Sequence, residues 1–112
     1  MKYKRTVLLD LDGVLNQYNG KFEADFIPPP LNGAKEFLEK LSQRFDVKLF
    51  TTRNRLLAAK WLIEHRLDIY ISDITNVKEP AWLHIDDRCL KFNGNFDETF
   101  TNIQTFDVWY KS

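Results

Sequence analysis

Residues 6–13, which read TVLLDLDG, decide the fold of this chain. The first four form an unbroken apolar and β-branched run, which is typical of a strand buried on both faces of a parallel sheet. Two carboxylates follow, at Asp10 and Asp12, and Gly13 then indicates a turn. The stretch therefore predicts a central strand that ends in acidic side chains.

The remaining chain alternates between helical and strand-like segments. One helix is expected over 33–44, where Ala34, Leu38 and Leu41 share an apolar face. Three further strands are expected, at 47–50, 69–71 and 83–85. A second helix is expected to be capped by Asn54, and a last helical or irregular segment to begin at Asp97 or Thr99. This order predicts an α/β protein with a three-layer Rossmann-like fold, in which helices flank a central parallel sheet.

The bulk composition limits the classes of protein. A chain of 112 residues predicts one domain, 1–112. Sixteen basic and sixteen acidic residues cancel, so no overall field attracts nucleic acid or an anionic membrane. No apolar stretch approaches the roughly 20 residues that a membrane helix needs. The basic start lacks the apolar run of a signal peptide, so we expect a cytoplasmic protein.

Two features point to the chain's environment and assembly. Cys89 is the only cysteine, so no internal disulfide can form, and we expect a buried, inert thiol in a reducing compartment. The tail is rich in aromatic residues, among them Phe100 and Trp109. We expect these rings to complete a small core; the alternative is a homo-oligomer that uses the tail.

Polar residues follow the predicted strands. Ligands in open parallel sheets bind beyond the carboxyl ends of the strands. The residues at those ends are Asp10 and Asp12 after the first strand, Thr51, Thr52 and Arg53 after the second, and Asp86, Asp87 and Arg88 after the fourth, with Lys78 in the loop before it. We expect them to converge at one edge of the sheet.

The carboxylates predict a metal site. Asp10 and Asp12 are two positions apart, so both lie on one face if the strand continues through them. Like charges on one face repel each other unless a cation joins them. Asp86 or Asp87 would complete an oxygen-rich site, which suits Mg²⁺.

Each residue also has a simpler interpretation when it is taken alone. Asp12 and Gly13 can form an ordinary turn, and Asp86 can begin a helix or a turn. Thr51 can be a strand-end hydroxyl bonded to backbone, and Lys78 a solvated surface lysine. The convergence of all of them favours a functional site.

These motifs resemble those of the haloacid dehalogenase-like (HAD) superfamily of phosphatases and phosphotransferases. DLDGVL at 10–15 resembles the first motif of that family. LFTTR at 49–53 is similar to the second, and VKEPAWLHIDDR at 77–88 resembles the third and fourth joined. The resemblance covers positions 7 to 88.

The resemblance implies the roles of the first two motifs. Asp10 would be the nucleophile that attacks phosphorus to form an aspartyl-phosphate. Asp12 would protonate the leaving oxygen and then activate water, and its backbone carbonyl would bind Mg²⁺. Thr51 would hydrogen-bond the transferring phosphoryl group, with Thr52 as the alternative for that role.

The later motifs imply the remaining roles. Lys78 would neutralise the phosphoryl charge and hold the nucleophile. Asp87 would be the main acidic Mg²⁺ ligand, with Asp86 beside it; which of the two is the principal ligand stays open. Apart from these roles, Arg53, Arg55 and Arg88 could contact phosphates of the substrate near the site; the alternative is that they are solvated loop charges.

The short connections imply that this chain has no cap domain. Only Asn16–Leu31 separates the first motif from the first helix, and we expect a flap hairpin there, around 18–21. An open site fits a bulky phosphorylated substrate: a nucleic-acid end, a nucleotide or a phosphoprotein. IDDR at 85–88 is similar to the 3′-phosphatase domains of some polynucleotide kinases, which favours a nucleic-acid substrate.

Three other functions use similar residues. A receiver domain requires a phospho-accepting aspartate after a later strand and an acidic pair before its lysine, and the order here differs. A binding protein of the same fold without catalysis is a second alternative. A phosphotransferase that passes the phosphoryl group to an alcohol is a third, and no residue separates it from a hydrolase.

Overall fold

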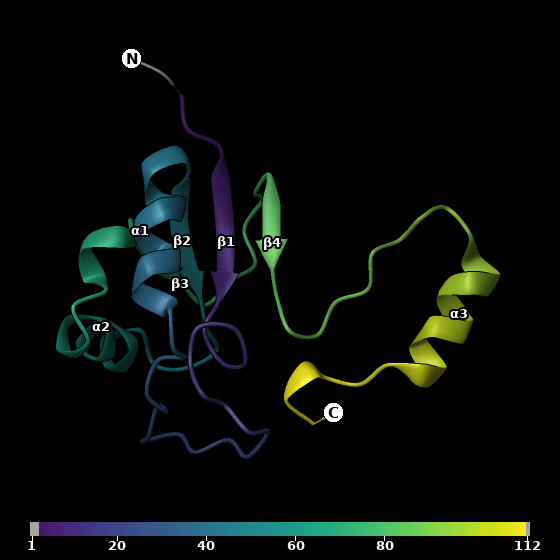
Figure 1. Ribbon diagram of the computed structural model, residues 1–112, viewed down its shortest axis with the longest axis horizontal. Coiled ribbons are helices and arrows are strands. Elements are labelled where there is room, and N and C mark those ends of the chain that lie inside the picture. Colours follow the sequence, from purple (N-terminus) through teal and green to yellow (C-terminus); the bar gives the residue numbers. More distant parts are fainter. Residues whose placement is uncertain (1–2, 112) are drawn as a thin grey trace.

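The computed structural model describes residues 3–111 and contains a four-stranded sheet whose strands are all parallel (Figure 1). The strands are β1 (Thr6–Asp10), β2 (Asp46–Phe50), β3 (Asp73–Thr75) and β4 (Leu83–Ile85), in the spatial order β3-β2-β1-β4. The predicted central strand is therefore confirmed. The register pairs Asp10 with Phe50 and Leu9 with Ile85, which aligns the carboxyl ends of three strands.

Two helices cover one face of this sheet. They are α1 (Ala34–Arg44) and α2 (Arg55–Glu64). Leu38 of α1 and Leu62 of α2 share a buried core with Leu9 and Leu49 of the sheet. Asn54 caps α2 as predicted, since its side chain accepts the amide protons of the first turn. An α/β protein with helices flanking a parallel sheet is confirmed, and the three-layer Rossmann-like arrangement stays a prediction.

An extended segment between β3 and β4 crosses the opposite face of the sheet. Glu79 lies 3.7 Å from the Lys48 ammonium, and the Trp82 ring stacks on Phe45 at 5.4 Å between centroids. β2 and β3 are added on one side of β1, whereas β4 is added on the other side. A right-handed crossover from β3 to β4 therefore has to run over the face that α1 and α2 leave open. This path places Lys78 near the carboxyl ends of the strands.

The predicted strand at 69–71 is wrong. Those residues overlap a 3₁₀ turn, η1 (Asp68–Tyr70), and the strand begins later, at Asp73. The chain reverses after α2 through Arg66, whose φ is +58°, and this buries Leu67. The side chain of Ile69 then points outward and is 77% exposed, so its β-branched character does not decide the pairing.

The flap between the first motif and α1 is a loop, not the predicted hairpin. Asn16 and Pro30 form an isolated antiparallel bridge, and residues 17–29 contain no strand. The two ends of the loop pair with each other instead: the Gln17 amide donates to the Pro29 carbonyl and the Leu31 amide to the Leu15 carbonyl.

The tail leaves the sheet after β4 (Figure 1). It contains α3 (Phe96–Thr105) and a 3₁₀ turn, η2 (Trp109–Lys111). The expectation that its rings complete the core is wrong for α3, which has no buried residue. Cys89 is exposed, contrary to expectation, and so are the residues at 90–92 that follow it. Val108 is buried, and it brings the last residues back to the body.

Candidate active site

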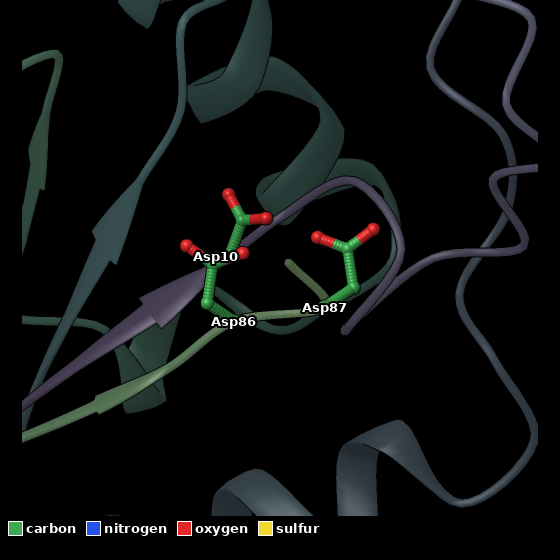
Figure 2. Close-up of side chains that lie close together, drawn as sticks. All are labelled: Asp10, Asp86 and Asp87. Carbon is green, nitrogen blue, oxygen red and sulfur yellow. The ribbon is translucent and has the colours of Figure 1, made fainter. Parts of the chain in front are cut away.

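Three carboxylates meet at the carboxyl edge of the sheet. Asp10 is the last residue of β1, and Asp86 and Asp87 directly follow β4. One oxygen of each lies within 4.8 Å of the others, and all three residues are half-buried. Figure 2 shows the carboxyl groups gathered between these two chain segments. The predicted convergence of the first and fourth motifs is present in the fold.

The electrostatics of this cluster favour a bound cation. The pKa of Asp10 is raised from 3.8 to about 8, first because burial disfavours its charged form, and then because of the negative charges of Asp86 and Asp87. At neutral pH the Asp10 carboxyl therefore holds a proton unless a cation takes the place of that proton. Three oxygen donors at this spacing fit a hard divalent cation such as Mg²⁺.

Lys78 lies beside the cluster and pairs with Asp86. Its ammonium donates a hydrogen bond to Oδ2 of Asp86. Burial alone would raise the pKa of Asp86, but the hydrogen bonds from Lys78 and from the Arg88 amide outweigh it and lower the pKa. The hydrogen bond to Asp86 raises the pKa of Lys78 in turn. The Lys78 side chain remains about half exposed, so it can also reach a ligand.

The second motif follows β2 at the same edge. Thr51 comes directly after Phe50, the register partner of Asp10, and it is buried. Its Oγ accepts the amide proton of Arg53 at 3.1 Å, which shapes the turn into α2. Thr52 is exposed on that turn, and Arg88 is exposed beyond Asp87. Both could face a ligand, but the residues described show no side-chain contact between either of them and the three carboxylates.

Asp12 is placed differently from the expectation. β1 ends at Asp10, so the prediction that Asp10 and Asp12 lie on one face of an extended strand is wrong. The Asp12 carboxylate instead accepts two hydrogen bonds from Arg53, at 2.9 and 3.1 Å, and a third from Asn16 at 2.9 Å. Its side chain is not among the three that form the cluster.

Arg53 is a buried connection between the site and the flap. Its side chain is 1% exposed, and Nη1 donates to the backbone oxygen of Glu23 at 2.6 Å. The guanidinium also lies over the Phe22 ring, at 4.6 Å from the centroid. These contacts occupy Arg53 within the protein, so its predicted contact with substrate would require the flap to move.

The tail contributes residues that sequence reasoning missed. The Tyr110 hydroxyl donates to Oδ2 of Asp87 at 2.9 Å, and Trp109 Nε1 donates to the Gly13 carbonyl at 2.6 Å. Gly13 has a φ of +85°, and a Cβ there would lie 2.3 Å from Oδ2 of Asp87. Only glycine permits this close approach. The Trp109 contact joins residues 96 positions apart, and no local pattern in the sequence indicates such a contact.

A cavity adjoins the cluster on the side of the tail. It has a volume of about 770 Å³ and lies between the flap, the start of α1 and the tail, with Tyr18, Trp109 and Tyr110 among its walls. The three carboxylates do not line it, and Tyr110 connects the two because its hydroxyl reaches Asp87. The arrangement places an acidic centre next to a cavity that has three large aromatic residues in its walls.

Comparisons of the chain with protein-family models, with curated proteins and with solved structures gave no match. The relation to the HAD superfamily therefore stays a resemblance carried by the motifs. Among residues 3–111, no helix has the length and apolar character needed to cross a membrane.

Proposed function

We propose that this protein is a Mg²⁺-dependent phosphomonoesterase of the HAD type, in which Asp10 is the nucleophile. The observation that carries the proposal is the meeting of Asp10, Asp86 and Asp87 within 4.8 Å. Lys78 adds a positive charge beside them. A group of anionic oxygens next to an ammonium, at the carboxyl ends of parallel strands, suits the positioning of a phosphoryl group.

Asp10, Asp86 and Asp87 would hold the cation. A bound Mg²⁺ would supply positive charge that offsets both these carboxylates and the phosphoryl oxygens. The raised pKa of Asp10 supports this assignment, because burial beside two other carboxylates is unfavourable without such a charge. Two hydrogen bonds fix the positions of these carboxylates: Lys78 donates to Asp86, and the Tyr110 hydroxyl donates to Asp87.

The proposed reaction has two steps on Asp10. In the first, an ionised oxygen of Asp10 forms a bond to phosphorus as the bond to the leaving oxygen breaks, and that oxygen takes up a proton. In the second, water attacks the same phosphorus, the bond to Asp10 breaks, and inorganic phosphate leaves. Lys78 and Thr51 are proposed to stabilise the charge on the phosphoryl oxygens in both steps.

Asp12 remains the proposed proton-transfer group. Two hydrogen bonds from Arg53 hold its carboxylate in a fixed position two residues beyond Asp10, where it can take a proton from the attacking water. We expect Asp12→Asn to slow the hydrolysis of p-nitrophenyl phosphate at the second step of the reaction, in which water attacks. If Asp12 also protonates the leaving oxygen, the same variant should slow the hydrolysis of an alkyl phosphate by a larger factor.

The substrate we propose is a bulky phosphomonoester, such as a nucleic-acid end or a nucleotide. The chain between the first motif and α1 forms a loop, over 17–29, and contains no cap domain that would limit the size of the ligand. The aromatic walls of the neighbouring cavity can hold a flat ring while the phosphate lies at the carboxylates. Thr52 and Arg88, both exposed, would contact further phosphates.

The test is a phosphatase assay on a panel of phosphomonoesters with Mg²⁺. The panel pairs 3′- and 5′-phosphorylated oligonucleotides with nucleotides, sugar phosphates, phosphopeptides and p-nitrophenyl phosphate. We expect hydrolysis that EDTA abolishes and Mg²⁺ restores. Asp10→Asn should lower it by about 10³-fold or more, and Asp97→Asn, which removes an exposed carboxylate on α3, should leave it unchanged. Activity that persists in EDTA would contradict the metal, and transfer to added alcohols would indicate a phosphotransferase.

A further inference from the structure

Helix α3 has an apolar face that stays exposed in the part of the chain that the structure describes. Phe96, Phe100 and Ile103 are spaced at i, i+4 and i+7, so they form one stripe, and they are between 57% and 80% exposed. The Phe92 ring extends the stripe, at 5.3 Å from Phe96. A helix of ten residues is barely stable in water by itself, so it needs a packing partner to persist.

Strand β4 has an apolar face that is only partly covered: Ile85 packs at the margin of the core, and Leu83 is exposed. The register places Leu83 opposite Val7 and Ile85 opposite Leu9, so both point to the side on which α1 and α2 pack. β4 is an edge strand beyond those helices, and Leu83 is 46% exposed. Parallel sheets are normally covered on both faces, and the exposed Leu83 leaves room for a further apolar partner on this one.

The chain exposes more surface than a compact monomer of the same mass. The chain exposes 8066 Å², whereas a globular monomer of 13.3 kDa exposes about 6,500 Å². Its radius of gyration is 15.1 Å, compared with about 13 Å for a compact domain of this length. The excess of about 1,600 Å² per chain, buried between two copies, falls in the range of about 2,000–5,000 Å² typical of obligate homodimers.

The charges near these two surfaces are complementary. α3 carries Asp97 and Glu98 and no basic residue. Arg88 and Lys91, which follow β4, are both exposed. The chain as a whole has no net charge, so two copies do not repel each other. Residues 88–95 hold α3 away from β4 of its own chain, as Figure 1 shows.

From these surfaces we infer that the protein is a homodimer in which α3 of each copy packs on β4 of the other. Phe96, Phe100 and Ile103 would cover Leu83 and Ile85 of the second copy. Because the exchange is reciprocal, the contact is two-fold symmetric and closes as a dimer. This inference does not rest on the proposed phosphatase activity, because the apolar contact between α3 and β4 involves none of the proposed catalytic or metal-binding residues.

The first test is the mass of the full chain in solution, by size-exclusion chromatography with light scattering. We expect twice the chain mass of 13.3 kDa. Ile103→Glu should halve that mass, while Asn102→Glu, which adds the same charge at the neighbouring exposed position of α3, should leave it unchanged. Circular dichroism confirms that each variant is folded. A wild-type monomer, or a dimer that Ile103→Glu leaves intact, would overturn the inference.

The second test identifies the surface that α3 contacts. Two chains are mixed, both with Cys89→Ser, one with Leu83→Cys and an affinity tag and the other with Ile103→Cys, and a short bismaleimide is added. We expect a tagged product that contains both chains, which only contact between copies can form. Replacing Ile103→Cys by Asn102→Cys should lower its yield severalfold. Equal yields from the two partners would contradict the proposed contact.

Discussion

The body and the tail of this chain contain similar apolar residues and use them in opposite ways. In the body, Leu9, Leu38 and Leu49 are fully buried between the sheet and its helices. In the tail, Phe96 and Phe100 have the spacing of a core helix and remain 80% and 63% exposed. Apolar periodicity therefore specifies a helix and its inner face, but it does not specify the surface that the face will meet.

The largest effect we expect lies at the connection between the site and the flap. Arg53→Ala would leave the Asp12 carboxylate without its two charged hydrogen bonds, in a position where its side chain is 17% exposed. Removing one partner of such a pair should lower the free energy of unfolding by about 3 kcal/mol. Urea unfolding measures the change. Arg55→Ala, at an exposed position two residues later, is the control and should change it by less than about 0.5 kcal/mol.

A second prediction concerns the point where the tail meets the body. Gly13→Ala would place a Cβ 2.3 Å from Oδ2 of Asp87 and 2.9 Å from the Tyr110 ring. We expect a loss of about 2–3 kcal/mol in the free energy of unfolding, because both strain and overpacking act there. Gly94→Ala is a matched control: its φ of +94° is similar, but no atom lies within 4 Å, so only about 1 kcal/mol of backbone strain applies. Equal losses would show that Asp87 and Tyr110 are not packed against Gly13.

A third prediction follows from the raised pKa of Asp10. The pKa of Asp10 is about 8 in the folded chain and near 3.8 in the unfolded chain. The protonated carboxyl therefore contributes its full stabilisation of the fold below pH 4, and this contribution is lost as the pH rises to about 8. Asp10→Asn cannot ionise. In EDTA it should therefore exceed the wild type in stability by on the order of 2 kcal/mol at pH 8, after allowance for solvent at this half-buried site, and by almost nothing at pH 4.

Thermal or urea unfolding at several pH values gives this difference directly. Saturating Mg²⁺ should remove the advantage of Asp10→Asn at pH 8, because the wild type then gains binding energy that the variant lacks. If the difference in stability between Asp10→Asn and the wild type did not depend on pH, the three carboxylates would not lie as close together as described.

The smallest effect we expect tests whether the tail belongs to the site. Tyr110→Phe removes the hydrogen bond to Asp87 and keeps the ring. The free energy of unfolding should fall by about 1 kcal/mol, and Mg²⁺ affinity, measured by calorimetry, should weaken by about tenfold because Asp87 is no longer held in place. Tyr70→Phe, at the half-buried end of η1, serves as the control. Unchanged affinity would limit Tyr110 to packing.

The fold was predictable where local patterns carry the information. The apolar run at 6–9 and the cap at Asn54 are each local, and both are confirmed. The strand expected at 69–71 failed because burial of Leu67 and the turn at Arg66, not β propensity, set the path of the chain. The position of α3 could not be predicted, since its stripe does not identify a partner.

The site was predictable to the level of single strands and not beyond. Residues that end neighbouring parallel strands must converge, so Asp10, Asp86 and Asp87 could be expected together. Whether Asp12 joins them depends on the residue at which β1 ends, and the pair with Arg53 depends on the turn that follows. Tyr110 reaches Asp87 only through the return of the tail, which is a tertiary contact without a local signature.

The central claim, that Asp10 is a phosphoryl-accepting nucleophile, is tested most directly by trapping. The wild type is mixed with Mg²⁺ and a saturating phosphomonoester from the panel, quenched in acid within one turnover, digested and analysed by mass spectrometry. We predict one phosphoryl group on the peptide that contains Asp10, and no label in Asp10→Asn, which should also be inactive. Full activity of Asp10→Asn, or a label that stays on another residue, would contradict the account.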